Sequence, residues 1–137
     1  MQISDWFGWH LPFVIAGLGA WRLAGGAVAG RLGAALLVAA GLLPEAFLAL
    51  PLLLGGMLVA RMATPPARRA WRAGRSLPGM LMALDLVVAL SLLRVAGIPD
   101  RPPRLAWPMF IANAIAQCGF VVAARMLRAD SESDAAR

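Results

Sequence analysis

The sequence predicts an all-α integral membrane protein: a compact bundle of four to five transmembrane helices, five being preferred, with short loops and no extramembrane domain. Composition is the first observation behind this, since 61% of the 137 residues are hydrophobic and only 15% are charged. The second is a mean hydropathy of +0.73. The third is the run from Leu32 to Ala60, whose 29 residues contain Glu45 as their sole charged side chain.

The first span is expected over residues 7–24, where apolar residues precede Trp21-Arg22 and the helix-weakening pair Gly25-Gly26. No Arg or Lys precedes it, so it lacks the positive region of a signal peptide and we expect it to be retained. Trp6 and Trp9 would lie in the aromatic belt at the bilayer surface, with His10 beside them.

The long run exceeds one comfortable crossing, because a continuous helix of this length would reach roughly 44 Å against a hydrocarbon core of about 30 Å. Pro44 fits a helix stop followed by a new start, and Glu45 suits a first helical turn. Breaking the run there gives spans over 27–42 and 45–60. Glu45 then lies at the outer surface, whereas a single span would place it in mid-membrane.

Arginine placement favours the broken run. A basic interfacial loop is expected over 61–77 and must be cytoplasmic. A hairpin in the long run puts ten arginines inside and three outside, against eight and five for a single span. The predicted topology is therefore a multi-pass protein of the bacterial inner membrane with its C-terminus in the cytoplasm.

Two further spans are expected over 78–95 and 105–127, separated by the charged, proline-rich turn 99–104. The whole of 1–127 would form a single transmembrane domain. The polar residues 128–137 are expected to be a disordered cytoplasmic tail.

Asp85 is the strongest candidate for an intramembrane functional residue, because a carboxylate near mid-span needs an internal partner or a wet cavity. Arg22 or the pair Asn113/Gln117, four residues apart on one helix face, could supply that partner. The functional interpretation is a proton or ion relay, and the structural one is a polar clasp or a protonated carboxyl. Arg22 could instead extend to the head groups from a span end.

Small residues at helical spacing predict close helix packing. The candidate positions are Gly26, Gly30, Gly56, Ala60, Ala112, Ala116, Gly119 and Ala123.

The basic loop carries a helical pattern that would dip an aromatic ring into the head groups and set arginines on lipid phosphates. A solvated loop that only sets topology is the alternative. The candidate head-group residues are Arg68, Arg69, Trp71, Arg72 and Arg75.

No cofactor or metal is expected, because Cys118 is the only cysteine and His10 the only histidine. Nucleotide-binding, zinc-protease and serine-hydrolase motifs are missing from the sequence, so no residue set supports an enzyme. Nucleic acid is not an expected partner, since topology explains the basic residues.

These observations leave three functions open. The first is a small accessory or assembly subunit that packs against a larger membrane complex and anionic lipid. The second is a transporter or channel component, as a homo-oligomer, with a polar path around Asp85. The third is a membrane enzyme that acts on lipid.

Overall fold

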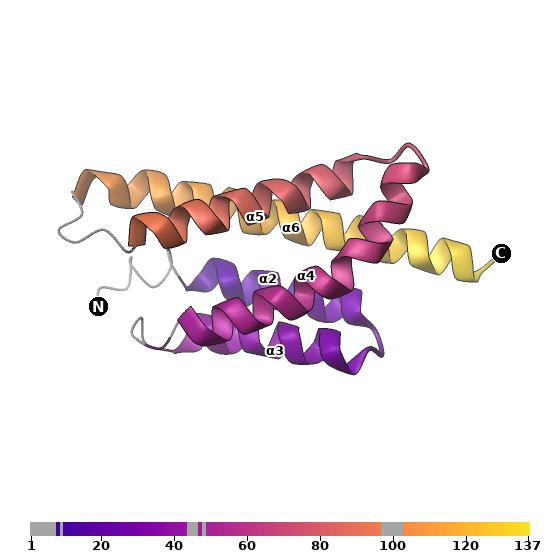
Figure 1. Cartoon of the computed structure of the whole chain (residues 1–137), viewed down its shortest axis with the longest axis horizontal. Coiled ribbons are helices and arrows are strands. Elements are labelled where there is room, and N and C mark those ends of the chain that lie inside the picture. The colour runs from indigo at the N-terminus through magenta and orange to yellow at the C-terminus, as the bar shows by residue number, and fades with distance from the viewer. Residues whose placement is uncertain (1–7, 9, 44–46, 48, 97–102) are drawn as a thin grey trace.

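The computed structural model describes residues 8, 10–43, 47, 49–96 and 103–137, and these residues form helices and turns without a strand. The predicted all-helical fold with five helices is confirmed over this part of the chain (Figure 1). The elements are α2 (Leu11–Ala24), α3 (Val28–Leu42), α4 (Ala49–Arg72), α5 (Leu77–Ala96), the short 3-10 helix η2 (Pro103–Leu105) and α6 (Ala106–Ala135).

The long apolar run is divided between two helices. The α3 helix ends at Leu42, Leu43 has an extended backbone, and α4 begins at Ala49. The α3 and α4 helices run antiparallel and pack on one another (Figure 1). Glu45, Trp6 and Trp9 lie outside the described residues.

The segment expected to be a basic loop continues α4 as a helix as far as Arg72, although Pro65 and Pro66 lie inside it. Figure 1 shows that α4 bends in this half. Prolines bend helices because they lack the backbone N–H that would donate to the preceding turn. The Thr64 hydroxyl donates a 2.6 Å hydrogen bond to the Ala60 carbonyl. Burial of Ala63 and Ala70 holds the helix on the bundle on both sides of the prolines.

The tail expected to be disordered is also helical, because α6 continues to Ala135. Two ion pairs support this extension. Arg128 Nε lies 3.0 Å from Glu132 Oε1 one turn further on, and Arg75 Nε lies 3.2 Å from Asp130 Oδ2. The second pair joins the extension of α6 to the turn between α4 and α5.

The helices are antiparallel along the chain, and α2 lies between α3 and α6 (Figure 1). On the outer sides, α4 packs on α3 and α5 packs on α6, while α4 and α5 make few contacts with one another. We call one end of the bundle the basic end: it comprises the α2–α3 turn, the second half of α4, the α4–α5 turn and the last turns of α6.

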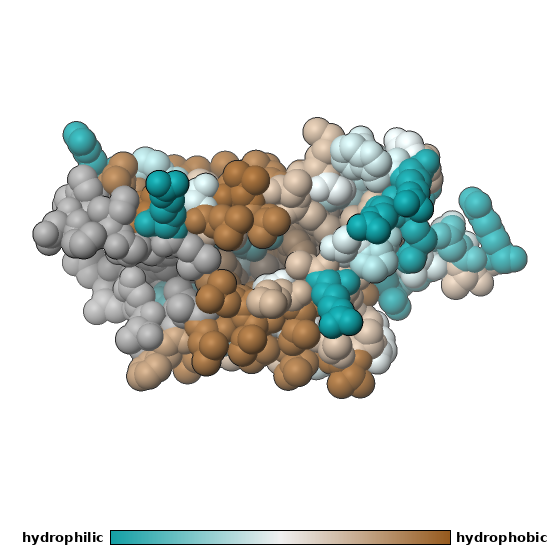
Figure 2. Space-filling model, viewed as in Figure 1, coloured by the Kyte–Doolittle hydropathy of each residue, from teal (hydrophilic) through white to brown (hydrophobic). Residues whose placement is uncertain are grey.

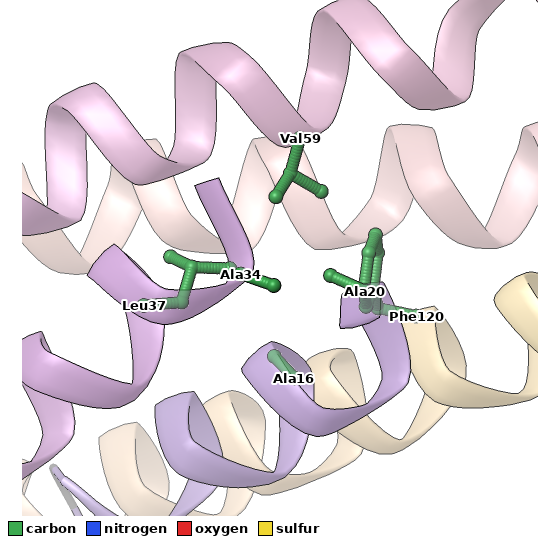
Figure 3. Close-up of a cluster of buried hydrophobic side chains, with 6 residues drawn as sticks. All are labelled: Ala16, Ala20, Ala34, Leu37, Val59 and Phe120. Carbon is green, nitrogen blue, oxygen red and sulfur yellow. The ribbon is translucent and has the colours of Figure 1, made fainter. Parts of the chain in front are cut away.

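The core combines small and large apolar side chains (Figure 3). Ala16 and Ala20 of α2, Ala34 and Leu37 of α3, Val59 of α4 and Phe120 of α6 form this buried cluster. The small volume of the alanines lets the α2 and α3 backbones approach closely.

Among the described residues, two helical stretches are long and apolar enough to cross a membrane, Leu50–Arg72 and Ala106–Ala135. This is fewer than the four to five spans expected. The α2 helix has 14 residues and α3 has 15, so they reach only ~21 and ~22 Å against a core of about 30 Å.

Candidate functional site

A cleft with a volume of about 600 Å³ lies between α4 and α5. Figure 2 shows the hollow between two strongly hydrophobic walls. The cleft exists because these two helices separate beyond the short turn that joins them. Phe13 of α2, Leu37 of α3 and Gln117 of α6 form its floor.

The walls of the cleft follow from helical spacing. On α4, positions 52, 56, 59, 63 and 67 line it at intervals of three or four residues. On α5, positions 79, 82, 86 and 89 do the same. Small residues on these stripes, including Gly56, Ala60 and Ala89, leave the space open, and a Cβ atom built at Gly56 has no neighbour within 4 Å.

Thr64, Arg68, Asp85 and Gln117 bring polar groups to this largely apolar space. The half-buried Asp85 carboxyl and the Gln117 amide lie beside one another and both line the cleft. Oδ1 of Asp85 is buried and receives no hydrogen bond from any described residue. The structure therefore pairs Asp85 with the amides on α6, while Arg22 is exposed elsewhere on the surface.

The two amides are tied into the bundle behind the cleft. Gln117 Nε2 donates to Asn113 Oδ1 at 3.3 Å, and Asn113 Nδ2 donates to the Gly8 carbonyl at 3.2 Å. Both residues are buried, Asn113 completely. A continuous row of polar groups thus runs from Asp85 through α6 to the segment that precedes α2.

A basic pocket of about 510 Å³ adjoins the cleft, and its lining is Arg61, Thr64, Pro65, Arg68, Arg69 and Arg72. Spacings of seven and four residues bring Arg61, Arg68 and Arg72 to one side of α4. Thr64 and Arg68 line both cavities. The pocket and the cleft are therefore two parts of one continuous surface.

The five candidate head-group residues divide between three environments. Arg68, Arg69 and Arg72 line the basic pocket. Trp71 lines the cleft, and its ring is 3.1 Å from a Cβ atom built at Gly79. Arg75 is held in the ion pair with Asp130.

The candidate packing positions also divide. A Cβ atom at Gly30 would lie 2.3 Å from Met62 Sδ, so Gly30 is a close crossing between α3 and α4. Ala116 and Ala123 are buried in α6, Ala112 is half-buried, and Gly119 makes ordinary contact with Leu81. Gly26 has no neighbour within 4 Å, and Gly56 and Ala60 face the cleft instead of another backbone.

Several structural residues were not apparent from the sequence. Gly33 and Gly55 form the tightest backbone crossing of α3 and α4, with a Cβ atom at Gly55 only 2.9 Å from the Gly33 carbonyl oxygen. His10 is buried, in place of the expected interfacial position, and no described residue bonds its Nδ1. Arg61 could have been found from its seven-residue spacing to Arg68.

The chain was compared with protein-family models, with curated proteins and with solved structures, and no significant match was found.

Proposed function

We propose that this chain is a small multi-pass protein of the bacterial inner membrane that holds a membrane amphiphile in the cleft between α4 and α5. It would serve there as a lipid-binding accessory subunit of a larger membrane complex. One observation carries the proposal: the cleft opens sideways through an exposed apolar surface (Figure 2), where its ligand would enter from the hydrocarbon.

The distribution of side chains supports a membrane environment. Large apolar side chains are exposed on every helix, and examples are Leu18, Leu32, Met57, Val87 and Ile115. Asn113 and Gln117 are meanwhile buried. A soluble surface rarely exposes so much apolar area, whereas lipid would cover it.

The basic end supports the proposed orientation. Arg68, Arg69 and Arg72 on α4 gather there with Arg128 on α6. Because cytoplasmic flanks carry the excess of arginine, this end would face the cytoplasm, with the C-terminus on the same side. Arg22 in the last turn of α2 and Arg31 in the first turn of α3 can extend to the head groups, and the bilayer can thin around these short helices.

Binding is favoured over conduction because the interior amides are already bonded to one another and to Gly8. A carboxyl without a second acid or a histidine beside it also gives little basis for catalysis. The row from Asp85 to Asn113 is the observation that favours a transporter component instead. If it carried ions or protons, Asp85→Asn would abolish flux in vesicles that contain the purified chain.

The binding proposal is tested with a pair of variants at one position. Gly56→Leu places a bulky side chain at the cleft from a position where its Cβ has no neighbour within 4 Å, and Gly56→Ala adds only that Cβ. Both replace a glycine that weakens the helix. Native mass spectrometry of the full chain in mild detergent should show retained lipid for wild type and Gly56→Ala. Retention should fall on the order of tenfold in Gly56→Leu. Equal retention in all three would contradict the proposal.

The accessory role has its own measurement. The full chain, expressed in its native host and extracted in mild detergent, should copurify with larger membrane proteins. It should also stay in the membrane fraction after an alkaline carbonate wash. Recovery as a lone monomer would contradict the subunit role, and release by carbonate would contradict the membrane assignment.

A further inference from the structure

The cleft and the basic pocket together have the form of a site for a ligand with an apolar tail and an anionic head. They share Thr64 and Arg68, so the apolar part and the basic part adjoin one another. Trp71 lines the cleft near this junction, and tryptophan favours the boundary between hydrocarbon and head groups. A ligand placed here would cross that boundary.

The charges of the basic pocket are uncompensated. Arg61, Arg68, Arg69 and Arg72 form no ion pair with a carboxylate in the described part of the chain. Arg75 and Arg128, at the same end of the bundle, each have such a partner. Four like charges within three turns of one helix repel each other, and a bound anion would relieve that repulsion.

We infer that the ligand is an anionic phospholipid of the cytoplasmic leaflet, with its phosphate against Arg68 and Arg72 and one acyl chain in the cleft. Guanidinium groups suit phosphate because their paired N–H donors can bind two of its oxygens. This inference rests on the proposed function, since it assigns the head group of the amphiphile that the cleft would hold.

The dimensions of the cleft fit an acyl chain. Its lining on α4 extends from Leu52 to Trp71, which is ~28 Å along a helix and is long enough to cover the ~15 Å of hydrocarbon in one leaflet. Gly56, Ala60 and Ala63 leave a smooth wall along that length. A partner's transmembrane helix could also meet an apolar cleft, but it would not neutralise the four arginines.

The experiment uses the full chain in neutral detergent and three probes: phosphatidylglycerol, phosphatidylcholine with the same acyl chains, and inorganic phosphate. Binding of each is measured by native mass spectrometry and by competition. Wild type should prefer phosphatidylglycerol on the order of tenfold. The double variant Arg68→Gln/Arg72→Gln should lose this preference and still bind phosphatidylcholine, and Arg68→Lys should keep part of it.

Arg125→Gln is the matched control, because Arg125 is exposed on α6 near the basic end and lines neither cavity. It should retain the preference. An unchanged preference in the double variant, or an equal loss in Arg125→Gln, would overturn the inference. If inorganic phosphate competed for binding as strongly as phosphatidylglycerol does, the claim that an acyl chain binds in the cleft would be overturned.

The two proposals fail separately. If Gly56→Leu binds both lipids as wild type does, the cleft is not the binding site and the proposed function fails. If Gly56→Leu loses both lipids while the arginine variants keep the preference, only the head-group assignment fails. Capture of a partner helix, with no effect of either lipid, would overturn both.

Discussion

The helix pairs α2/α3 and α4/α5 are both joined by short turns, yet the first pair is closed and the second is open. Between α2 and α3 the backbones touch: a Cβ atom at Gly17 would lie 2.9 Å from the Ala34 carbonyl oxygen, and one at Gly41 would lie 2.8 Å from that of His10. Between α4 and α5, the small residues Gly56, Ala60 and Ala89 border the cleft.

Small residues thus have opposite consequences in the two pairs. In the first they allow another backbone to approach, and in the second they leave an open volume. The difference arises from helix direction, because the bend in α4 and the position of α5 on α6 carry the second pair apart. Spacing of small residues alone therefore cannot distinguish a crossing from a cleft.

The sharpest test of this contrast places one substitution in each pair. Gly41→Leu should destabilise the fold by about 3 kcal/mol or more, because its Cβ would meet Val14 Cγ2 at 2.4 Å and the backbone of α2. Gly56→Leu, in open space, should leave the stability near that of wild type. Unfolding by SDS in mixed micelles, followed by circular dichroism, measures both, and equal losses would break the comparison.

The buried amide row behind the cleft should be the next most sensitive feature. Asn113→Ala removes the donor to Gly8 and the acceptor of Gln117, and should cost about 1–3 kcal/mol of unfolding free energy. The control is Ser91→Ala, whose hydroxyl is exposed and bonds its own helix at Val87. If the two variants have the same unfolding free energy, the amide row does not stabilise the fold.

On the open side, Asp85 should matter less for folding, because it lines the cleft and no described residue donates to its Oδ1. Asp85→Asn should change the unfolding free energy by less than about 1 kcal/mol in the same assay. If Asp85→Asn lowered the unfolding free energy as much as Asn113→Ala does, Asp85 would be a structural clasp between α5 and α6. The cleft residue and the buried amide row would then contribute equally to stability.

The smallest effect is expected at the ion pair that fastens the α4–α5 turn to α6. Asp130→Asn should cost less than about 1 kcal/mol, since both side chains are partly exposed. That loss should disappear in about 1 M salt, which screens surface charges. A larger cost that persists in salt would show that this pair, and not the bend in α4, sets the separation of α4 and α5.

The helices themselves were predictable from the sequence. Apolar runs ended by Gly25-Gly26 and by Pro44 located α2 and α3, and the arginine count favoured dividing the long run. Local signals failed where tertiary contacts override them. Pro65 and Pro66 suggested a loop, but α4 continues as a helix with Ala63 and Ala70 buried on either side of them. The tail is helical because Arg75 and Arg128 pair with its acids.

The candidate site was predictable only residue by residue. Asp85, Gln117 and the arginines from 68 to 72 were identified because charge and amide groups are rare in an apolar sequence. The cleft that connects them was not, since it depends on the angle between α4 and α5, and that angle depends on the bend in α4. Gly26 and Gly56 were chosen for their spacing, whereas Gly33 and Gly55 make the closest crossing.

The two prolines of α4 have a mechanical consequence. Neither supplies an N–H group, so the carbonyls of Arg61 and Met62 cannot receive the usual helical bond, and the ladder is interrupted where the apolar arm of α4 meets its arginine arm. Residues from both arms line the cleft, and residues from both arms line the basic pocket. If the proposed phospholipid binds here, the angle between the two arms of α4 would set the distance from its phosphate to the far end of the cleft, and so the acyl-chain length that fits.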